Sequence, residues 1–380
     1  MQIHGDCNRA FMPLREAFAA NFADGLEVGA SLGACVRGRP VLDLWAGHAD
    51  AERTRPWERD TIVTVNSTTK IPLMICVLML VDRGFIKLDT PVAAYWPAFA
   101  AGGKQAVTVR DVLSHQGGVP GLDPPASPTD WRDWERITAR IAAEPHWFGG
   151  ERRIAYHPVT TGHILGEVMR RVDGRTPGQF LQDEIAGPAN VDIQIGVREK
   201  PTLARCTALI RPPIPDGPPP FDAIGLRVLM SVPQGDGSWE SIHAEFPSGN
   251  AITNGRAVAR LGSILADGGM LDGRRYLTEA SVREAMTTQA EGVDWLFGQM
   301  RMGLNLSLHS EAFPLPSPTS CYWGGAGGSF CVMDPKTGLS VAYAMNNGID
   351  SHYGEDPRFL RYWTAIAEVL VALEAGAPVA

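Results

Sequence analysis

Residues 61–84 read TIVTVNSTTKIPLMICVLMLVDRG and hold the strongest local pattern in the chain. The β-branched run 61–65 favours a strand. The apolar stretch 71–81 is typical of a buried helix, and Gly84 is suited to the C-terminal end of that helix. The segment therefore predicts a strand, a short turn and a helix, in that order.

The turn of this segment places Ser67 three residues before Lys70, in an S-x-x-K pattern. Residues three apart share one face of a helix, so the lysine can reach the serine hydroxyl. Ser67 also lies at the helix N-terminus, where its own amide can stabilise an oxyanion. The same pair equally fits a helix-capping serine followed by a surface lysine. A nucleophilic serine would need a further partner, because a lysine with its usual pKa of about 10.4 stays charged.

A second serine lies in a pattern that resembles a nucleophile, because residues 29–33 read GASLG and match G-x-S-x-G. That pattern marks a nucleophile only where a strand turns sharply into a helix. Ser31 instead lies in a β-rich run, 30–36, which the turn 37–39 joins to a second run, 40–45, as in a hairpin. We therefore predict that Ser31 is a strand residue and not a nucleophile.

The composition favours a globular enzyme with a small-molecule partner. With 380 residues the chain exceeds the usual size of a single hydrophobic core, so two lobes are expected. The net charge of −8 gives no electrostatic footprint for nucleic acid or an anionic membrane. Histidines and cysteines show no zinc-ligand spacing, and neither a metal nor another cofactor is predicted.

Three features bear on the cellular location. The first 22 residues lack the regions of a secretory signal and are predicted to form an amphipathic helix. The apolar run 71–81 is too short for a membrane span, which takes about 20 residues. The six cysteines form no C-x-x-C pair, as is typical of reduced thiols in the protein core. A cytoplasmic protein is expected.

Four stretches carry a resemblance that extends over nearly the whole chain. They are VNSTTK at 65–70, DVLSHQGGVP at 111–120, YHP at 156–158 followed by GHILG at 162–166, and WGGAGG at 323–328. In order and spacing they resemble the serine β-lactamase and penicillin-binding-protein superfamily, and most closely class C β-lactamases and family VIII carboxylesterases. This resemblance implies an α/β (α+β) fold, with a mainly antiparallel sheet flanked by helices and a mostly helical second lobe.

The resemblance also implies a role for each matching residue. Ser67 would be the nucleophile, and Lys70 and Tyr156 would move its proton. The main-chain amides of Ser67 and Ala326 would form the oxyanion hole. The residues that would contact the substrate are Trp323, Gly324 and Gly325.

The chain departs from the family pattern at two positions. Pro158 stands where the family usually has an asparagine, which removes a side-chain amide that could recognise a substrate amide. Trp323 stands where β-lactamases carry the lysine of K-T-G, so a cation for a substrate carboxylate is missing. The glycine-rich run 322–331 otherwise predicts an edge strand beside the serine.

Other patterns could compete for a functional role, and we predict that they are structural. Ser248-Gly249-Asn250 spells S-x-N but is interpreted as a turn before a helix that begins near Asn254. Lys336-Thr337-Gly338 spells K-T-G but is expected between two strands. His115 and His157 have no carboxylate at an informative spacing. The aromatic residues that could either line the cleft or simply pack are Trp131, Trp134, Trp147 and Phe148.

Together these patterns predict an α/β lobe from residues 1–66 and 250–380, a mostly helical lobe from 67–249, and an active site at their seam. The expected function is that of a carboxylesterase-type serine hydrolase that cleaves small neutral esters through an acyl-enzyme. The partner would be a small-molecule ester, with no nucleic acid and no membrane. A β-lactamase or D-peptidase, an acyltransferase to an alcohol, and an inactive binding protein are the alternatives.

Overall fold

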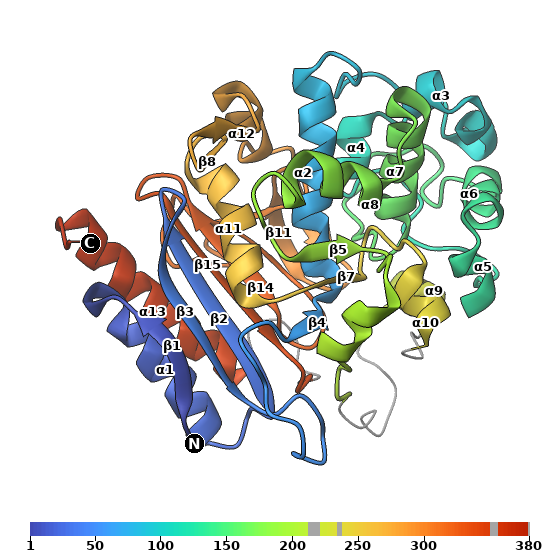
Figure 1. Cartoon of the computed structure of the whole chain (residues 1–380). Helices are drawn as coiled ribbons and strands as arrows, with labels where there is room; N and C mark the ends of the chain where they lie inside the picture. Colours follow the sequence, from blue (N-terminus) through green and yellow to red (C-terminus); the bar gives the residue numbers. More distant parts are fainter. Residues whose placement is uncertain (212–220, 234–237, 350–355, 379–380) are drawn as a thin grey trace.

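The largest element of the protein is a nine-stranded antiparallel sheet (Figure 1). The computed structural model describes residues 1–211, 221–233, 238–349 and 356–378. In space the strands follow the order β1-β3-β2-β15-β14-β13-β12-β11-β10. Their bounds are β1 (Ile3–Cys7), β2 (Gly29–Val36), β3 (Arg39–Gly47), β10 (Ala290–Asp294), β11 (Gly298–Met302), β12 (Ser307–Leu308), β13 (Cys321–Gly324), β14 (Phe330–Asp334) and β15 (Leu339–Met345).

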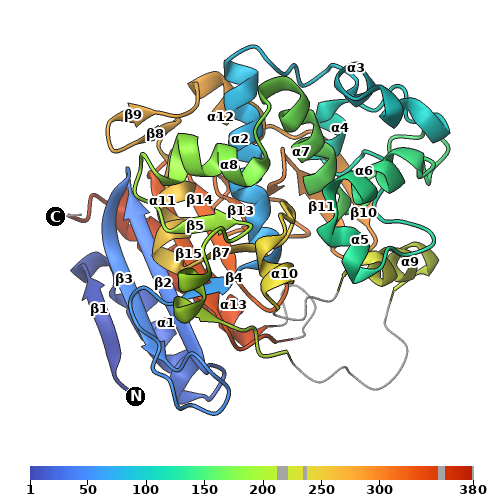
Figure 2. The same ribbon diagram turned by 45° about the vertical axis from the view of Figure 1, so that its right-hand side comes forward.

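Helices cover both faces of this sheet (Figures 1 and 2). Helix α11 (Gly255–Ala266) packs on one face against β2, β14 and β15. Helices α1 (Met12–Ala23) and α13 (Pro357–Glu374) pack against each other and share a hydrophobic core with the opposite face. Every residue of β2 and β15 is therefore buried, which explains why these strands read as continuous apolar runs.

The predicted hairpin over residues 30–45 is confirmed. Strands β2 and β3 are antiparallel neighbours, and the chain reverses at Arg37 and Gly38. Both residues have positive φ angles, 48° and 74°, as in the two-residue turns that match the twist of paired strands. Ser31 thus lies within a central strand.

The prediction of a helix over the first 22 residues is wrong for its first part. Residues Ile3–Cys7 form β1, an edge strand paired with β3, and the α-helix begins at Met12 after the short helix η1 (Arg9–Phe11). The middle of β1, His-Gly-Asp, is polar and exposed. Backbone pairing with β3 holds this strand, and such pairing does not require the alternating hydrophobic residues by which a strand is recognised in the sequence.

The expectation of an edge strand beside the serine also needs correction. Strand β13 lies inside the sheet, between β14 and β12. However, β12 has only two residues and pairs with Cys321 and Tyr322. Among the described residues, no strand pairs with Trp323 or Gly324 on that side. The end of β13 is therefore a local edge within an interior strand.

Most other helices come from the middle of the chain, around the buried helix α2. Helix α2 packs against α7 and α8, and its residues 70–80 are all buried. The division into lobes at residues 66 and 250 stays a prediction. The sequence of residues 211–221, RPPIPDGPPPF, is typical of a loop, and most of this run lies outside the described residues. The remaining α-helices are α2 (Lys70–Asp82), α3 (Val92–Tyr95), α4 (Val109–Leu113), α5 (Pro128–Arg132), α6 (Trp134–Ala143), α7 (Thr160–Asp173), α8 (Pro177–Leu181), α9 (Ala223–Ser231), α10 (Trp239–His243) and α12 (Glu279–Ala285).

Two small sheets and four short helices complete the described fold. The four-stranded sheet has the order β5-β7-β4-β6 and leads directly into the segment of Ser67. Its strands, and those of the two-stranded sheet, are β4 (Ile62–Thr64), β5 (Ile193–Ile195), β6 (Cys206–Thr207), β7 (Ala251–Thr253), β8 (Met270–Leu271) and β9 (Arg274–Arg275). The short helices are η2 (Asn66–Thr69), η3 (Pro97–Gly103), η4 (Gln182–Ala186) and η5 (Lys200–Arg205).

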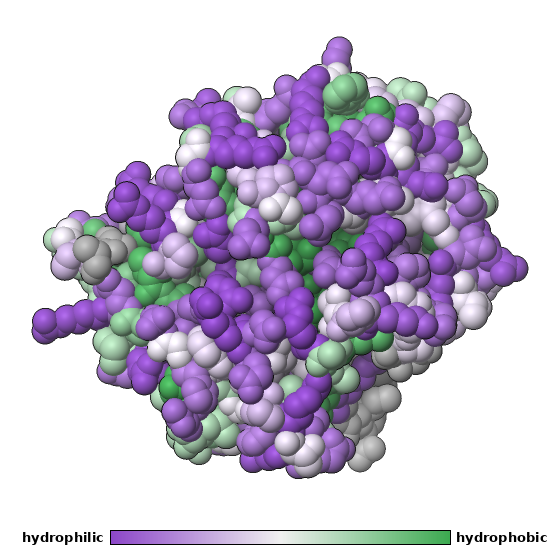
Figure 3. All heavy atoms as spheres, viewed as in Figure 1, coloured by the Kyte–Doolittle hydropathy of each residue, from purple (hydrophilic) through white to green (hydrophobic). Residues whose placement is uncertain are grey.

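The surface is mostly polar on the face that Figure 3 shows, where hydrophobic residues are visible in smaller areas between hydrophilic ones. In the described part of the chain, no helix has the length and apolarity that a membrane crossing requires.

Candidate active site

The predicted strand, turn and helix around Ser67 are confirmed as β4, η2 and α2. Ser67 is half-buried in η2, a short 3-10 helix that continues into α2. Asn66 starts this helix with a positive φ of 44°, a conformation that asparagine tolerates better than most residues. Lys70 is the first residue of α2 and is fully buried.

The structure brings the three predicted catalytic residues together. The Tyr156 hydroxyl donates a hydrogen bond to Ser67 Oγ at 2.6 Å. Lys70 Nζ lies 3.2 Å from the same oxygen and 5.0 Å from the centre of the Tyr156 ring. Ser67 Oγ is therefore within hydrogen-bond distance of two groups that can exchange a proton with it.

Main-chain oxygens hold the Lys70 amine. Nζ donates to the carbonyls of Pro158 and Ser248, each at 2.9 Å, and no carboxylate of the described residues contacts it. Burial holds the pKa of Lys70 well below its usual value. A neutral amine has two N–H donors and one lone pair, which matches two carbonyls and the Ser67 hydroxyl.

The predicted turn lies at residues 247–249, and strand β7 separates it from α11, whose N-cap is Asn254. Sequence reasoning nevertheless missed the contacts of Ser248 and Pro158 with Lys70. Both residues contact Lys70 through main-chain carbonyls, and a pattern of side chains in the sequence does not predict where a carbonyl lies in the fold.

A buried aspartate sets the position of Tyr156. The Tyr156 N–H donates to Asp294 Oδ2 at 2.5 Å, and Trp295 Nε1 donates to the Tyr156 carbonyl at 3.1 Å. Burial raises the pKa of Asp294, although main-chain amides, that of Tyr156 among them, oppose this shift. Neither Asp294 nor Trp295 was predicted, because they lie far along the sequence in a segment without a recognisable motif.

The predicted oxyanion residue Ala326 lies in a β-turn. Gly328 N–H donates to the Gly325 carbonyl at 3.0 Å, and Gly327 has a φ of 92°, which glycine adopts without strain at the third position of a turn. Ala326 is exposed, and its N–H donates to no acceptor among the described residues. The Ser67 amide belongs to the first turn of η2, where main-chain donors lack acceptors within the helix.

Gly325 brings this turn against the serine. A Cβ at Gly325 would lie 2.2 Å from the Val65 carbonyl oxygen and 3.1 Å from the Ser67 nitrogen. Only a glycine allows the two backbones to approach so closely. The amides of Ser67 and Ala326 thus lie on neighbouring backbone segments, and neither has an acceptor within the described part of the chain.

Further side chains that sequence reasoning missed link the same two segments. Asn66 Nδ2 donates to the Ala326 carbonyl at 2.6 Å. Ser329 Oγ donates to the Val65 carbonyl at 2.8 Å and lies 3.0 Å from Thr68 Oγ1. The only local sign in the sequence that Asn66 could contact the Ala326 turn is its position directly before Ser67.

An apolar pocket of about 240 Å³ adjoins the uncovered end of β13. None of its lining residues carries a charge, and Phe297 and Trp323 also pack against the Tyr156 ring. Of the predicted substrate-contacting residues, Trp323 and Gly324 line this pocket, whereas Gly325 faces Ser67. The lining residues are Leu296, Phe297, Gly298, Met300, Ser307, Phe313, Tyr322, Trp323 and Gly324.

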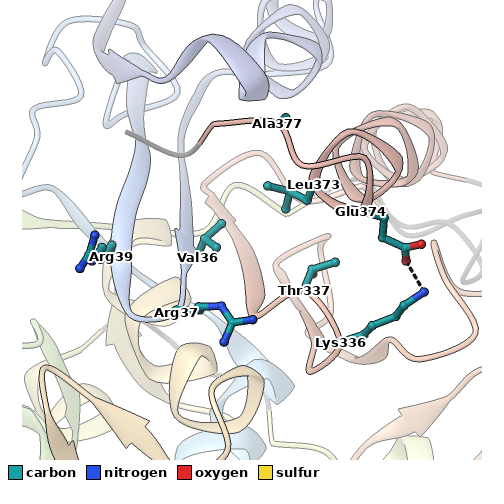
Figure 4. A pocket seen from close by; sticks show the side chains of 8 residues that line it. All are labelled: Val36, Arg37, Arg39, Lys336, Thr337, Leu373, Glu374 and Ala377. Carbon is teal, nitrogen blue, oxygen red and sulfur yellow. Dashed lines mark ion pairs between the residues drawn. The ribbon is translucent and has the colours of Figure 1, made fainter.

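Two of the three competing motifs, those of Ser31 and of residues 336–338, lie in a strand and in a turn between strands, as predicted. Ser31 is buried in β2, and its Oγ accepts a hydrogen bond from Gly255 N–H at 3.0 Å. Residues 336–338 form the turn between β14 and β15, and Lys336 Nζ forms an ion pair with Glu374 at 2.9 Å (Figure 4). They border a groove of about 880 Å³ at the end of β14 opposite to the Ala326 turn.

The two histidines near the site pack as neutral rings. His157 Nε2 accepts a hydrogen bond from Val119 N–H at 3.1 Å, and burial lowers the pKa of His157 to about 3. His115 stacks on Trp323 with 5.6 Å between ring centres, and burial holds its pKa well below the usual value. In the described structure neither ring contacts a carboxylate, in line with a structural role.

In the described structure, the four aromatic residues that precede Tyr156 contact side chains other than those of Ser67, Lys70 and Tyr156. Trp131 packs against His163 and Phe246, and Trp134 Nε1 donates to Glu167 at 2.8 Å. Trp147 lies under the Arg227 guanidinium at 3.9 Å, and Phe148 packs on His146. The aromatic rings around Tyr156 instead come from His115, Trp295, Phe297 and Trp323.

The chain resembles known proteins over most of its length. A family model described as Beta-lactamase matches residues 18–361. The protein named Esterase/beta-lactamase LipL from Mycobacterium tuberculosis is 29% identical over 361 residues, which cover 91% of this chain and 83% of that protein.

Two solved structures match almost the whole chain. A penicillin-binding protein homologue from Caulobacter crescentus has 36% sequence identity and a TM-score of 0.89, covering 98% of this chain and 100% of the other. A structure described as a family VIII carboxylesterase has 35% identity and a TM-score of 0.89, covering 97% and 100%. These matches confirm the predicted β-lactamase-like fold and the predicted resemblance.

Proposed function

The chain belongs to the beta-lactamase family, and we propose that it is a serine hydrolase that cleaves small neutral carboxylic esters. The observation that carries this proposal is the position of Ser67 Oγ, 2.6 Å from the Tyr156 hydroxyl and 3.2 Å from Lys70 Nζ. Similar proteins that are named esterase or carboxylesterase support the assignment to ester hydrolysis.

In the first half of the proposed reaction, Ser67 Oγ attacks the carbonyl carbon of the ester. The lone pair of the Lys70 amine receives the serine proton, and the Tyr156 hydroxyl, which donates to Oγ, passes its own proton to the leaving alcohol and is reprotonated from Lys70. The carbonyl oxygen becomes an oxyanion, which accepts hydrogen bonds from the amides of Ser67 and Ala326. The carbon–oxygen bond to the alcohol then breaks, and the alcohol leaves with the proton.

In the second half, water attacks the carbonyl carbon of the acyl-enzyme. The same pair of groups takes a proton from this water, and the oxyanion forms again at the same amides. When the bond to Ser67 Oγ breaks, the proton returns to the serine and the carboxylic acid leaves. Each half of the reaction uses the same donors, so the enzyme ends in its starting state.

The preference for neutral, apolar substrates rests on the pocket beside Trp323 and Gly324. Its lining carries no charged side chain, so a substrate carboxylate would lose water there without gaining a counter-ion. An alkyl or aryl group of an ester instead gains from leaving water. We therefore expect p-nitrophenyl butyrate to be hydrolysed with a higher kcat/KM than a chromogenic cephalosporin or a D-amino-acid amide.

The test of the proposed nucleophile compares Ser67→Ala with Ser31→Ala. Ser67→Ala should lower kcat/KM for p-nitrophenyl butyrate by about 10³ or more and should abolish labelling by a fluorophosphonate. Ser31→Ala is the matched control, because Ser31 is a buried strand residue whose only role in this proposal is structural. Ser31→Ala should retain activity within about threefold per labelled site, because the nucleophile and its partners are unchanged.

Three results would contradict the proposal. Esterase activity that survives in Ser67→Ala would exclude Ser67 as the nucleophile. A wild-type protein that is folded but neither labelled nor active on any ester would favour the inactive binding protein. A cephalosporin hydrolysed faster than the butyrate ester would favour a β-lactamase.

A further inference from the structure

A buried charge cluster lies behind the Ala326 turn and takes no part in the proton transfers. Its members are Glu27, Tyr343, Asp356 and Arg358, and each is at least nine-tenths buried. They come from the segment before β2, from β15 and from the start of α13. Burying a guanidinium is costly unless its donors are satisfied, so the contacts of Arg358 call for an explanation.

Arg358 uses its donors on two carboxylates and two main-chain carbonyls. Nη2 donates to Asp356 Oδ2 at 2.7 Å and to the Gly327 carbonyl at 2.8 Å. Nη1 donates to the Asn347 carbonyl at 2.7 Å and lies 3.5 Å from Glu27 Oε2. Tyr343 in turn donates its hydroxyl proton to Glu27.

The contact with Gly327 reaches the turn that carries the oxyanion amide. Three of the four turn residues, Gly325, Gly327 and Gly328, are glycines, and glycine loses more conformational freedom on folding than any other residue. Such a turn needs contacts from outside to keep one conformation. A Cβ at Gly328 would lie 2.7 Å from Arg358 Nη2, which shows how closely the guanidinium lies against the turn.

We propose that Arg358 is a positioning residue that fixes the Ala326 amide for the oxyanion. It holds the Gly327 carbonyl from the side of α13, while Asn66 holds the Ala326 carbonyl from the side of η2. The inference rests on the proposed function, since it needs an oxyanion at the Ala326 amide. It assigns the buried cluster a second task beyond joining the segment before β2 to β15 and to the start of α13.

An arginine suits this task better than a lysine. The planar guanidinium presents five donors in a fixed geometry, so it can bind Asp356 and Gly327 with one nitrogen and Asn347 with another. A lysine amine is a single point on a flexible stem and would leave part of this set without a donor. Misplacing a catalytic group by about 1 Å can cost about 100-fold in rate.

The test uses Arg358→Lys and Arg358→Gln, with Arg361→Lys and Arg361→Gln as matched controls. Arg361 lies one turn further along α13 and is also paired, to Asp24 at 2.6 Å and Asn21 at 2.5 Å, but it has no contact with the Ala326 turn among the described residues. The active sites of each variant are counted by complete labelling with a fluorophosphonate. Thermal unfolding is recorded in parallel.

Per labelled site, both Arg358 variants should lower kcat/KM for p-nitrophenyl butyrate by about 10- to 100-fold. The inhibition constant of butylboronic acid, whose tetrahedral adduct on serine places an oxygen at the same amides, should rise by a comparable factor. The Arg361 variants should leave both quantities within about threefold, because they do not touch the turn. A lowered unfolding temperature alone, with both quantities unchanged per labelled site, would overturn the proposal, because that pattern belongs to a purely structural residue.

Asp356→Asn covers the case in which the Arg358 variants do not fold. This variant keeps the shape of the aspartate but weakens its hold on Arg358, so a smaller loss of about three- to tenfold is expected in both quantities. No change in either quantity would again overturn the proposal. A wild-type protein without Ser67-dependent esterase activity would refute the proposed function and this inference together, whereas an active wild type with unaffected Arg358 variants would refute only the role of Arg358.

Discussion

Lys70 and Lys104 are both buried lysines, and their surroundings differ in one respect that matters for chemistry. Lys104 Nζ donates to the carbonyls of Ala101 at 2.6 Å, of Ala142 at 3.1 Å and of Glu144. It lies 5.2 Å from the centre of the Phe99 ring, much as Lys70 lies 5.0 Å from the Tyr156 ring. Both amines are thus held by main-chain oxygens beside an aromatic ring.

The difference is the hydroxyl groups. Beside Lys70 stand Ser67 Oγ and the Tyr156 hydroxyl, whereas Phe99 offers no exchangeable proton to Lys104. Burial lowers the pKa of both lysines. The pKa of Lys104 falls to about 8, and the Glu144 carboxylate opposes that shift. A buried amine is therefore common to both places, and the two hydroxyl groups beside Lys70 are what distinguishes its surroundings.

The largest expected effect separates the two lysines directly. Lys70→Met should lower kcat/KM for p-nitrophenyl butyrate by about 10³ or more, because Ser67 loses its proton acceptor. Lys104→Met should leave kcat/KM within about threefold per labelled site, although it leaves three carbonyls without their donor and should lower the unfolding temperature. Equal losses of activity in both variants would show that the two lysines act alike through stability.

The next largest effect is expected when the tyrosine beside Lys70 is replaced by phenylalanine, the residue that lies beside Lys104. Tyr156→Phe removes only the hydroxyl and should lower kcat/KM by about 10²- to 10³-fold. In the double variant with Lys70→Met, the further loss beyond the worse single variant should stay below about tenfold, because residues that act as one unit are not additive. Losses that add fully on a logarithmic scale would mean that Tyr156 and Lys70 work separately.

A smaller effect is expected from placing a second lysine at the site. The comparison uses an anionic ester, such as a p-nitrophenyl hemiester of a dicarboxylic acid, and the neutral butyrate. Trp323→Lys should raise the ratio of kcat/KM for the anionic ester to kcat/KM for the butyrate by about 10- to 100-fold. The gain in one charge-assisted contact is the physical reason. Trp323→Met serves as the control for the lost ring. If the lysine variant is folded and its ratio is unchanged, Trp323 does not determine the substrate preference.

The smallest effect concerns stability and pH. The pKa of Lys70 is lowered in the folded protein, while the unfolded chain has a value of about 10.4. Between these values the unfolded chain binds more protons, so the free energy of unfolding rises with pH, by up to about 1.4 kcal/mol per pH unit from this group. Lys70 therefore destabilises the fold below its folded pKa and ceases to do so above pH of about 10.4.

The measurement is chemical unfolding of the wild type and of Lys70→Met across the alkaline range. The wild type should gain stability relative to Lys70→Met as the pH rises, and the difference should level off near the unfolded pKa. The same difference for Lys104→Met should develop only above the folded pKa of about 8. A difference for Lys70→Met that stays constant with pH would mean that Lys70 is charged in the folded protein.

The sequence predicted most of what depends on neighbouring residues. The strand, turn and helix over 61–84 and the hairpin over 30–45 follow from β-branched and apolar runs with turn residues between them, and both were confirmed. The S-x-x-K spacing by itself places Ser67 and Lys70 on one face of a helix, within reach of each other. Tyr156 and Ala326 entered only through the family resemblance, because nothing local ties either of them to Ser67.

The failures share a cause, which is that backbone pairing leaves little trace in side-chain patterns. The helix predicted over β1 was wrong because the polar residues of this strand lie on an exposed edge, where only hydrogen bonds to β3 hold the strand. Strand β13 was expected at an edge, and the two-residue length of β12 was not visible in the sequence.

What the sequence by itself determined is the chemical repertoire: a serine and a lysine three residues apart at a helix start, a glycine-rich turn, and a tryptophan in place of a cation. Only the tertiary structure decided what those groups do. Carbonyls from Pro158 and Ser248, 88 and 178 residues away from Lys70, hold its amine, and packing removes water from it. In the proposed mechanism the lysine acts as a base because burial removes its water, and distant donors hold the glycine turn. Both proposals rest on contacts that exist only once the chain has folded.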